Sequence, residues 1–459
     1  MAERKSRIYL CLAHMSGNEM KYIQEAFDTN WVVPLGPNVN GFEADLEAFV
    51  NGVKVNGAAG EKKIVDFSVG NAAVNLSLEV SVDNRKMQTY KKALDKKVVA
   101  LSAGTAAVHL ALLACGVGPG DEVLVQSFTF CASSHPVTYL GATPVFVDSE
   151  EETWNMDPQL LEEAIRDRMA KTGKKPKAIV PVYLYGMPAR IDEIIAVADR
   201  YGIPIIEDAA EGLGSRYDGQ VCGTFGRYGV LSFNGNKMIT TSGGGALICP
   251  DDEAKKKIMF YATQARESYP YYQHEEIGYN YRMSNICAGI GRGQMTVLDE
   301  HIEHHKHVAC MYRELLAGVE GITFHENPSQ RYDSNYWLST IILDPNLKVK
   351  GEDKAYAVAV QGAVGGAAGV THAAATLHTD CEPNRNVEAM RMALDAAGIE
   401  SRPLWKPMHK QPVYKDNPCY VNGVSEKLFK CGLCLPSGPC VTDEDVHYIV
   451  DCLKEQIER

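Results

Sequence analysis

Short apolar runs alternate with longer amphipathic segments between residues 98 and 249. The runs have the length and the β-branched content of buried strands, and they cover residues 98–101, 122–126, 144–147, 177–182 and 204–208. The segments between them, residues 105–115, 158–169 and 191–201, repeat their apolar positions with the period of a helix. This β-α-β alternation predicts an α/β fold with a mostly parallel sheet and helices on both of its faces.

The pattern changes after residue 284, where longer helices begin with one that the apolar spacing predicts over residues 286–305. We therefore predict an N-terminal segment and a large domain over residues 1–284, and a smaller C-terminal α+β domain over residues 285–459. Two segments, about residues 50–97 and about residues 348–383, interrupt this order. The partly alternating stretch 64–82 in the first predicts an added hairpin or sheet edge, and the alanine and glycine content of the second favours a loop.

The composition narrows the classes of function. Lys and Arg total 46 and Asp and Glu total 58, and the resulting net charge of −12 argues against nucleic acid as a partner. No run is long and apolar enough for a membrane span, and residues 8–13 are too few for a secretory signal, so we expect a cytoplasmic protein. The 13 cysteines are an odd number scattered through predicted elements, which indicates reduced thiols. Cys431 and Cys434 have the spacing of a metal pair, but no second pair matches them, so no metal site is predicted.

Polar residues stand where the predicted strands end. Asp208 closes one apolar run, and Lys237 lies between another run and the glycines at 243–245. In an open parallel sheet, ligands bind at the carboxyl ends of the strands. A lysine that forms an imine, and a buried carboxylate that keeps a pyridine nitrogen protonated, are what pyridoxal phosphate chemistry requires. The alternatives are a surface lysine in a turn and an aspartate that caps a helix.

A candidate phosphate site lies beside these two residues. Gly104 and Thr105 open a predicted helix, whose first backbone amides point toward an anion. Ser232, at the end of a further apolar run, is placed to add a hydroxyl. The glycines at 243–245 remove side-chain bulk where the backbone and a flat cofactor come close.

Several motifs follow one another in a fixed order along the chain. They are Pro34-Leu-Gly-Pro37, Leu101-Ser-Ala-Gly-Thr105, Phe233-Asn-Gly-Asn-Lys237, Gly278-Tyr-Asn-Tyr-Arg282 and Ser401-Arg-Pro-Leu-Trp405. This ordered set resembles the DegT-type nucleotide-sugar aminotransferases, which are fold-type I pyridoxal phosphate enzymes. The resemblance runs from near residue 10 to the C-terminus, apart from the two interrupting segments. The last three motifs most resemble the subgroup that makes UDP-linked 4-amino sugars of the bacillosamine type.

The resemblance implies a fold-type I architecture, pyridoxal 5'-phosphate as cofactor, and a role for each matching residue. Lys237 carries the cofactor as a Schiff base and moves protons, and Asp208 pairs with the pyridine nitrogen. Phe130 stacks on the cofactor ring and Glu211 contacts its hydroxyl side. Asn280 reaches the phosphate of a neighbouring subunit, which implies a homodimer with shared active sites. A core position for Phe130 and an ordinary turn at Asn280 are the alternatives.

Residues 402–409 combine a cation, an aromatic ring and an imidazole in Arg402, Trp405 and His409. These groups suit a nucleotide diphosphate and a sugar, and interdomain packing is the alternative. The resemblance implies transfer of an amino group from glutamate, leaving 2-oxoglutarate, to a UDP-linked 4-keto-6-deoxy sugar. Two other functions stay open: a sugar 3-dehydratase of the same fold, in which histidine replaces the lysine, and a non-catalytic cofactor- or sugar-binding regulator.

Overall fold

The computed structural model describes residues 7–52, 94–356 and 381–458. The hairpin or sheet edge predicted for residues 64–82 lies outside these residues. The loop predicted around the alanine- and glycine-rich residues 362–369 lies outside them as well.

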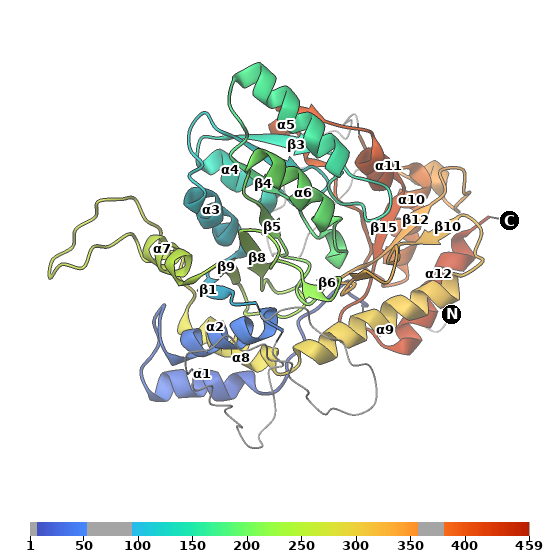
Figure 1. Ribbon diagram of the computed structural model, residues 1–459. Coiled ribbons are helices and arrows are strands. Elements are labelled where there is room, and N and C mark those ends of the chain that lie inside the picture. The colour runs from blue at the N-terminus through green and yellow to red at the C-terminus, as the bar shows by residue number, and fades with distance from the viewer. Residues whose placement is uncertain (1–6, 53–93, 357–380, 459) are drawn as a thin grey trace.

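A single continuous sheet forms the centre of the molecule (Figure 1). Its strands, in spatial order, are β1 (Lys97–Leu101), β9 (Gly245–Cys249), β8 (Tyr228–Ser232), β5 (Ile206–Asp208), β4 (Ala178–Val180), β2 (Glu122–Gln126), β3 (Thr143–Val147) and β14 (Cys419–Tyr420). Parallel bridges from Ile179 to Ile205 and from Val182 to Asp208 join its two halves between β4 and β5. Only β9 runs antiparallel to its neighbours, so the observed sheet is the mostly parallel one that the sequence predicts.

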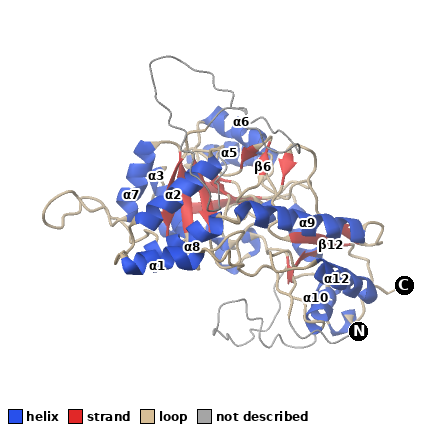
Figure 2. Cartoon of the chain, turned by 90° about the horizontal axis from the view of Figure 1, so that it is seen from below, coloured by secondary structure: helices blue, strands red, loops and turns tan. Residues whose placement is uncertain are grey.

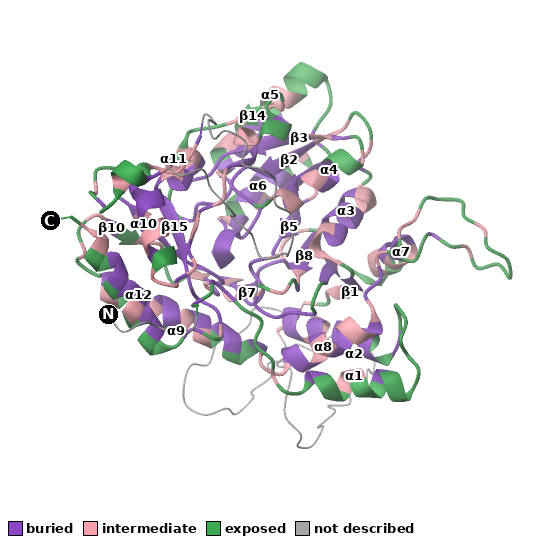
Figure 3. Cartoon of the chain, turned by 180° about the vertical axis from the view of Figure 1, so that it is seen from behind, coloured by how far each residue is buried: buried purple, intermediate pink, exposed green. Residues whose placement is uncertain are grey.

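Both faces of this sheet are buried because the strands carry apolar side chains on both sides. Val98 and Ala100 pack into one hydrophobic cluster, and their neighbours Val99 and Leu101 pack into another on the opposite face. The second face is covered by α3 (Gly104–Ala114), α4 (His135–Tyr139) and α7 (Asp252–Ala262). The first face is covered by α2 (Pro37–Val50), α5 (Pro158–Thr172), α6 (Ile191–Tyr201) and α8 (Asn285–Met295), and α1 (Glu19–Asp28) packs outside α8. Figure 3 shows the buried strands inside this shell.

The chain after residue 297 builds a second, antiparallel sheet. Its order is β10 (Ile322–Phe324), β12 (Ser339–Leu343), β15 (Gly432–Leu435) and β13 (Arg402–Pro403). It packs with α9 (Leu298–Leu316), α10 (Arg385–Ala396) and α12 (Asp443–Gln456) around a separate hydrophobic cluster, next to α11 (Val424–Cys431). Figure 2 shows α9, β12, α10 and α12 grouped at one end of the molecule. A small sheet pairs β11 (Tyr332–Asp333), from the second region, with β6 (Arg216–Tyr217), which in turn pairs with β7 (Gln220–Val221) of the first region.

One strand from the C-terminal part of the chain belongs to the first sheet. β14 pairs in parallel with Phe146 and Val147 of β3. Directly after β3, the carboxylate of Asp148 accepts backbone N–H bonds from residues 422, 423 and 425, at 3.2, 3.0 and 3.2 Å. The division of the chain at residue 284 stays a prediction, and the two parts that it separates share this sheet edge.

The helix predicted over residues 286–305 is two helices, α8 and α9, and this prediction was wrong in its continuity. At the break, the backbone N–H groups of Thr296 and Val297 bond to the carbonyls three residues earlier, of Gly293 and Gln294. Such tight turns end the regular i to i−4 ladder. The apolar periodicity continues through the break, which is why the sequence pattern does not reveal it.

Candidate active site

Four of the predicted site residues lie at one edge of the central sheet. Asp208 is the last residue of β5, and Ser232 is the last residue of β8. Lys237 lies in the loop from β8 to β9, and Gly104 is the first residue of α3, which follows β1. Because β1, β8 and β5 run in one direction, their carboxyl ends meet at the same edge, where open parallel sheets bind ligands.

The side chain of Lys237 points into the molecule and is only 14% exposed. Its Nζ lies 3.4 Å from Oε1 of Glu211 and 3.9 Å from the centre of the Trp337 ring. The indole N–H of Trp337 donates to the carbonyl of Asn236 at 2.6 Å, which holds the ring next to the lysine. These contacts exclude the surface lysine that was the alternative reading of the sequence. They also leave one amine enclosed by an aromatic face and a carboxylate.

Asp208 is buried at the end of its strand. Its Oδ2 accepts the hydroxyl of Ser133 at 2.6 Å, and its Oδ1 accepts the backbone N–H of Ala210 at 3.1 Å. No described helix starts at this point, so the helix-capping alternative does not apply. Burial raises the pKa of Asp208, while the Ser133 hydroxyl, the Ala210 amide and Lys237 act in the opposite direction. Each oxygen of the carboxylate accepts one hydrogen bond here and can accept a second. It can therefore accept a further, cationic N–H, such as the protonated ring nitrogen of pyridoxal phosphate.

Glu211 is also buried, and it connects Lys237 to a neighbouring loop. Its Oε2 accepts the backbone N–H of Tyr185 at 2.7 Å, and its other oxygen faces Lys237. Burial raises the pKa of Glu211, and the nearby Lys237 charge opposes that rise. Its backbone carbonyl accepts an N–H of Asn335 at 2.9 Å. The contact that the structure gives Glu211 is with the lysine, and its predicted contact with the hydroxyl side of the cofactor ring stays a prediction.

The start of α3 fits a phosphate group. Its N-cap residue, Ala103, provides no side-chain hydrogen bond, so the first backbone amides of the helix have no capping partner from this residue. A Cβ on Gly104 would lie 3.1 Å from Cβ of Ser232, and a Cβ on Gly245 would overlap the backbone of Ala103 and Gly104. Glycine at both positions therefore lets β8, β9 and the helix start approach closely, and Thr105 follows within the first turn.

The predicted aromatic residues lie next to each other. Phe130 follows β2 and is 52% exposed, and its ring centre lies 5.6 Å from that of Trp405. The core position considered for Phe130 is thereby excluded. Trp405 also stacks on Tyr185, with ring centres 6.0 Å apart and an interplanar angle of 23°.

The other two members of the 402–409 tract contact residues outside this group. His409 is buried, with Nδ1 2.7 Å from Oγ of Ser127 and Nε2 3.3 Å from Oε1 of Glu426. Arg402 donates to Oε1 of Glu400 at 2.9 Å. Both ring nitrogens of His409 are thus engaged within the chain, an arrangement that anchors the tract to the end of β2. The substrate contacts assigned to Arg402 and His409 stay predictions.

Asn280 is exposed and pairs with Thr263 directly after α7. The chain between these two residues forms the extended arm beside α7 in Figure 1. The residue after Asn280, Tyr281, accepts the backbone N–H of Ser102 at 2.8 Å, and Arg282 donates to Glu43 and, at 2.7 Å, to the carbonyl of Ala100. This segment is thereby fixed beside β1, close to the turn that leads into α3. The predicted contact of Asn280 with a neighbouring subunit stays a prediction.

Three residues of the site were missed in the sequence. Ser133 and Tyr185 follow β2 and β4, so a wider application of the strand-end rule would have found them. No pattern in the sequence indicated Trp337, because this residue reaches Lys237 only through the packing of the second sheet against the first. Within the described ranges, no three His, Cys, Asp or Glu side chains converge as metal ligands would. Among the helices of residues 7–52, 94–356 and 381–458, none has both the length and the apolar character needed to cross a bilayer.

The sequence matches the DegT/DnrJ/EryC1/StrS aminotransferase family over residues 83–378 and 352–454. The chain belongs to this family. It is 40% identical, over 97% of its own length and 95% of the other, to EpsN of Bacillus subtilis, a candidate pyridoxal phosphate-dependent aminotransferase. It is 31% identical, over 98% of both chains, to a GDP-perosamine synthase of Caulobacter vibrioides.

A solved structure gives the same result for the fold. A DegT DnrJ EryC1 StrS aminotransferase from Brucella abortus superposes with a TM-score of 0.73 at 26% identity, covering 96% of this chain and 95% of that one. The predicted fold-type I α/β architecture is confirmed, as is the prediction of a pyridoxal phosphate-dependent sugar aminotransferase. The residues at the sheet edge supply what that cofactor needs: an inward-facing lysine, a buried carboxylate and an open helix N-terminus.

Proposed function

We propose that this protein transfers an amino group from glutamate to a nucleotide-linked 4-keto-6-deoxy sugar, with UDP as the nucleotide and a bacillosamine-type amino sugar as the product. The observation that carries the proposal is the placement of Lys237 and Asp208 at one sheet edge. The lysine is held between Glu211 and Trp337, and the aspartate is buried with Ser133. An aminotransferase needs both, an amine that exchanges with the amino donor and an acid that keeps the cofactor ring electron-poor.

Each residue then has a defined task. The bound cofactor supplies an electron sink that stabilises negative charge on the carbon bearing the amino group. Lys237 would move a proton between that carbon and the cofactor, and Glu211 and Trp337 keep its Nζ within reach. Asp208 holds the proton on the ring nitrogen, and its low-dielectric surroundings strengthen that ion pair.

The phosphate and the ring faces are assigned to other residues. Gly104, Thr105 and Ser232 bind the phosphate through the start of α3. Phe130 stacks on the cofactor, and Trp405 with Arg402 and His409 forms the sugar-nucleotide side of the site. The contact between Phe130 and Trp405, at 5.6 Å between ring centres, supports this arrangement because it brings the two groups together.

The proposed assembly is a cytoplasmic homodimer in which Asn280 of one subunit reaches the phosphate of the other. The exposed position of Asn280 and the exposed apolar residues on the arm before it support this, since such residues favour a protein interface. They are Tyr269, Tyr271, Tyr272 and Ile277. None of the 13 cysteines, all of which lie in the described residues, forms a disulfide, which agrees with a reducing compartment.

A GDP-linked substrate is the second candidate, and the full-length similarity to a GDP-perosamine synthase favours it. The motifs around Lys237, Asn280 and Trp405 favour the UDP-linked sugar. The two candidates share the same sheet-edge chemistry and differ only in what the 402–409 tract and its surroundings recognise.

The test has two stages. Purified protein carrying pyridoxal phosphate is mixed with glutamate, and the absorbance of the bound cofactor should change as the amino group is transferred and 2-oxoglutarate appears. The aminated protein is then offered UDP-, GDP- and dTDP-linked 4-keto-6-deoxy sugars, and the products are identified by mass spectrometry. An amino sugar formed fastest from the UDP compound is the expected result.

Other outcomes point to other functions. Preference for the GDP sugar would replace the UDP assignment. A dehydrated sugar without nitrogen would indicate the 3-dehydratase, although that group carries histidine where this chain has Lys237. An absorbance unchanged by glutamate would favour the non-catalytic regulator.

A further inference from the structure

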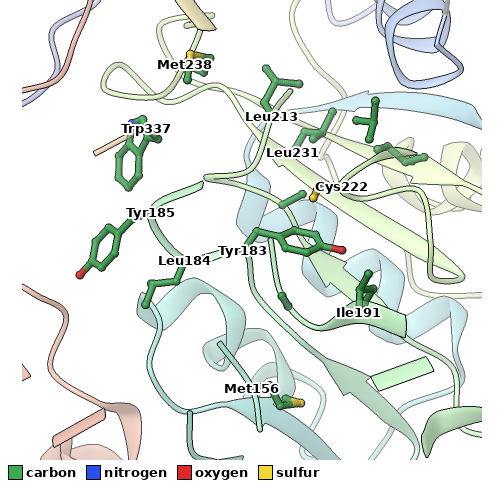
Figure 4. Close-up of a cluster of buried hydrophobic side chains, with 14 of the residues drawn as sticks. Met156, Tyr183, Leu184, Tyr185, Ile191, Leu213, Cys222, Leu231, Met238 and Trp337 are labelled. Atoms are coloured by element: carbon green, nitrogen blue, oxygen red, sulfur yellow. The ribbon is translucent and has the colours of Figure 1, made fainter. Parts of the chain in front are cut away.

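Tyr185 has a backbone conformation that residues with a side chain rarely adopt. It lies in the 3-10 turn Leu184–Gly186 after β4, with φ 54° and ψ 14°. The left-handed region is disfavoured because Cβ crowds the following carbonyl, and such residues persist where several contacts hold them. The side chain of Tyr185 is fully buried, and Figure 4 shows it directed away from Tyr183 of the same loop.

The two polar groups of Tyr185 face two different parts of the site. Its backbone N–H donates to Oε2 of Glu211 at 2.7 Å, and Oε1 of that carboxylate lies 3.4 Å from Nζ of Lys237. Its phenolic oxygen accepts the backbone N–H of Trp405, also at 2.7 Å. One residue therefore connects the lysine side of the site to the 402–409 tract, 220 residues further along the chain.

This contact holds the backbone of Trp405 beside Tyr185. The centre of the Trp405 ring lies 6.0 Å from that of Tyr185 and 5.6 Å from that of Phe130. Its indole Nε1 is buried, and no acceptor within the described residues bonds to it. A buried donor without a partner is costly, and one beside a substrate site is suited to a substrate oxygen.

We propose that Tyr185 is a positioning residue for nucleotide-sugar recognition: its hydroxyl holds the backbone of Trp405 in the place from which the indole N–H meets the sugar nucleotide. The inference deepens the proposed function and rests on it. The link to Glu211 uses the backbone of Tyr185 and the link to Trp405 uses its side chain, so the two can be separated by mutation. Removing the hydroxyl leaves the Glu211 contact with Lys237 in place.

The test compares Tyr185→Phe with Tyr183→Phe in the complete protein carrying pyridoxal phosphate. Tyr183 is the matched control, because it is equally buried in the same loop and its hydroxyl donates to Glu207, a buried carboxylate away from Lys237. We expect Tyr185→Phe to raise KM for the nucleotide sugar, and Kd for UDP measured by calorimetry, about tenfold, the effect of losing one hydrogen bond that holds a binding group in place. Its kcat and its KM for glutamate should stay within about twofold of the starting protein.

A second comparison tests the route through Trp405. If Tyr185 acts by holding Trp405 in place, Trp405→Phe should raise the same KM, and adding Tyr185→Phe to it should cause no further rise. The inference is overturned by an unchanged KM and Kd in Tyr185→Phe, by an equal rise in Tyr183→Phe, by an equal loss in the glutamate reaction, or by additive effects in the double variant.

Failure of the proposed function gives a different result. If the unsubstituted protein aminates no sugar but binds UDP, and Tyr185→Phe binds UDP more weakly, the proposed reaction is wrong and the role of Tyr185 as a positioning residue still holds. If the unsubstituted protein binds no nucleotide, both the proposed reaction and the role of Tyr185 are wrong.

Discussion

Substituting Ser133 by alanine removes one of the two hydrogen bonds that hold the Asp208 carboxylate. The Ser133 hydroxyl donates to Oδ2 of Asp208 at 2.6 Å. The oxygen of the same hydroxyl lies within hydrogen-bond distance, 2.9 Å, of the Thr129 hydroxyl. Short O–H bonds to a carboxylate are among the stronger hydrogen bonds in proteins. After the substitution, the backbone N–H of Ala210 is the remaining described hydrogen bond to this side chain.

The magnitude follows from the charge on the acceptor. A hydrogen bond to a charged group contributes about 1.5–3 kcal/mol. At about 1.4 kcal/mol for each factor of ten, its loss should lower kcat/KM for glutamate by roughly tenfold to a hundredfold. The assay is stopped-flow absorbance of the bound cofactor after mixing with glutamate.

The pH dependence gives this prediction a sign. Burial already raises the pKa of Asp208, and loss of the Ser133 hydroxyl raises it further, because that bond favours the ionised form. The carboxylate must be ionised to hold the ring nitrogen proton, so the acid limb of the kcat/KM profile should move to higher pH. The pKa of Asp208 is higher in the folded protein than in the unfolded chain, so this group costs stability as the pH rises from the unfolded pKa through the folded pKa. Because Ser133→Ala raises the folded pKa further, it should lower Tm more at pH 7 than at pH 4.

Ser134→Ala is the control, because this neighbouring serine is equally buried and its hydroxyl bonds to the carbonyl of Cys131 at 3.1 Å, not to Asp208. It should leave both the rate and the acid limb unchanged. If Ser133→Ala reacts with glutamate as fast as the starting protein does, the carboxylate of Asp208 does not depend on this bond, and the assignment of Asp208 loses its support.

Two further substitutions test the lysine and the phosphate site. Lys237→Ala should fold, abolish multiple turnover and prevent covalent attachment of the cofactor on borohydride reduction, as seen by peptide mass spectrometry; an adduct on another lysine would contradict the assignment. Gly104→Ala places a Cβ 3.1 Å from Cβ of Ser232 and should raise Kd for pyridoxal phosphate about tenfold in an equilibrium titration, whereas Gly118→Ala, with no atom within 4 Å, should not. Equal affinity in the two glycine variants would show that the start of α3 is not where the phosphate binds.

The sequence reveals the parts of the site that depend on local pattern. Asp208, Ser232 and Gly104 each lie next to an apolar run, so identifying the strands and applying one rule about parallel sheets locates them together. The antiparallel β9 and the short β14 were not predicted, because pairing direction and sheet edges depend on contacts between segments distant in the chain. The position of Trp337 beside Lys237 and the left-handed backbone of Tyr185 depend on the same kind of packing, and only the place of Tyr185 after β4 could have been read from the sequence.

The break between α8 and α9 shows what a regular apolar pattern cannot predict. Here the apolar pattern is regular, yet the chain turns at Thr296 and Val297. A regular pattern identifies the face of a helix that is buried, and it does not show where the backbone hydrogen bonds stop.

The pairing of β14 with β3 has a consequence for how the protein is made. Translation proceeds from the N-terminus, and a ribosome releases β3 more than 250 residues before it releases Cys419 and Tyr420, which complete that edge. A nascent chain of this enzyme therefore carries an open strand edge for most of its synthesis, with the Asp148 carboxylate still lacking its three amide donors. Such an edge is a template for pairing with another unfinished chain, so the order of the strands leaves the nascent chain open to intermolecular pairing until β14 is made.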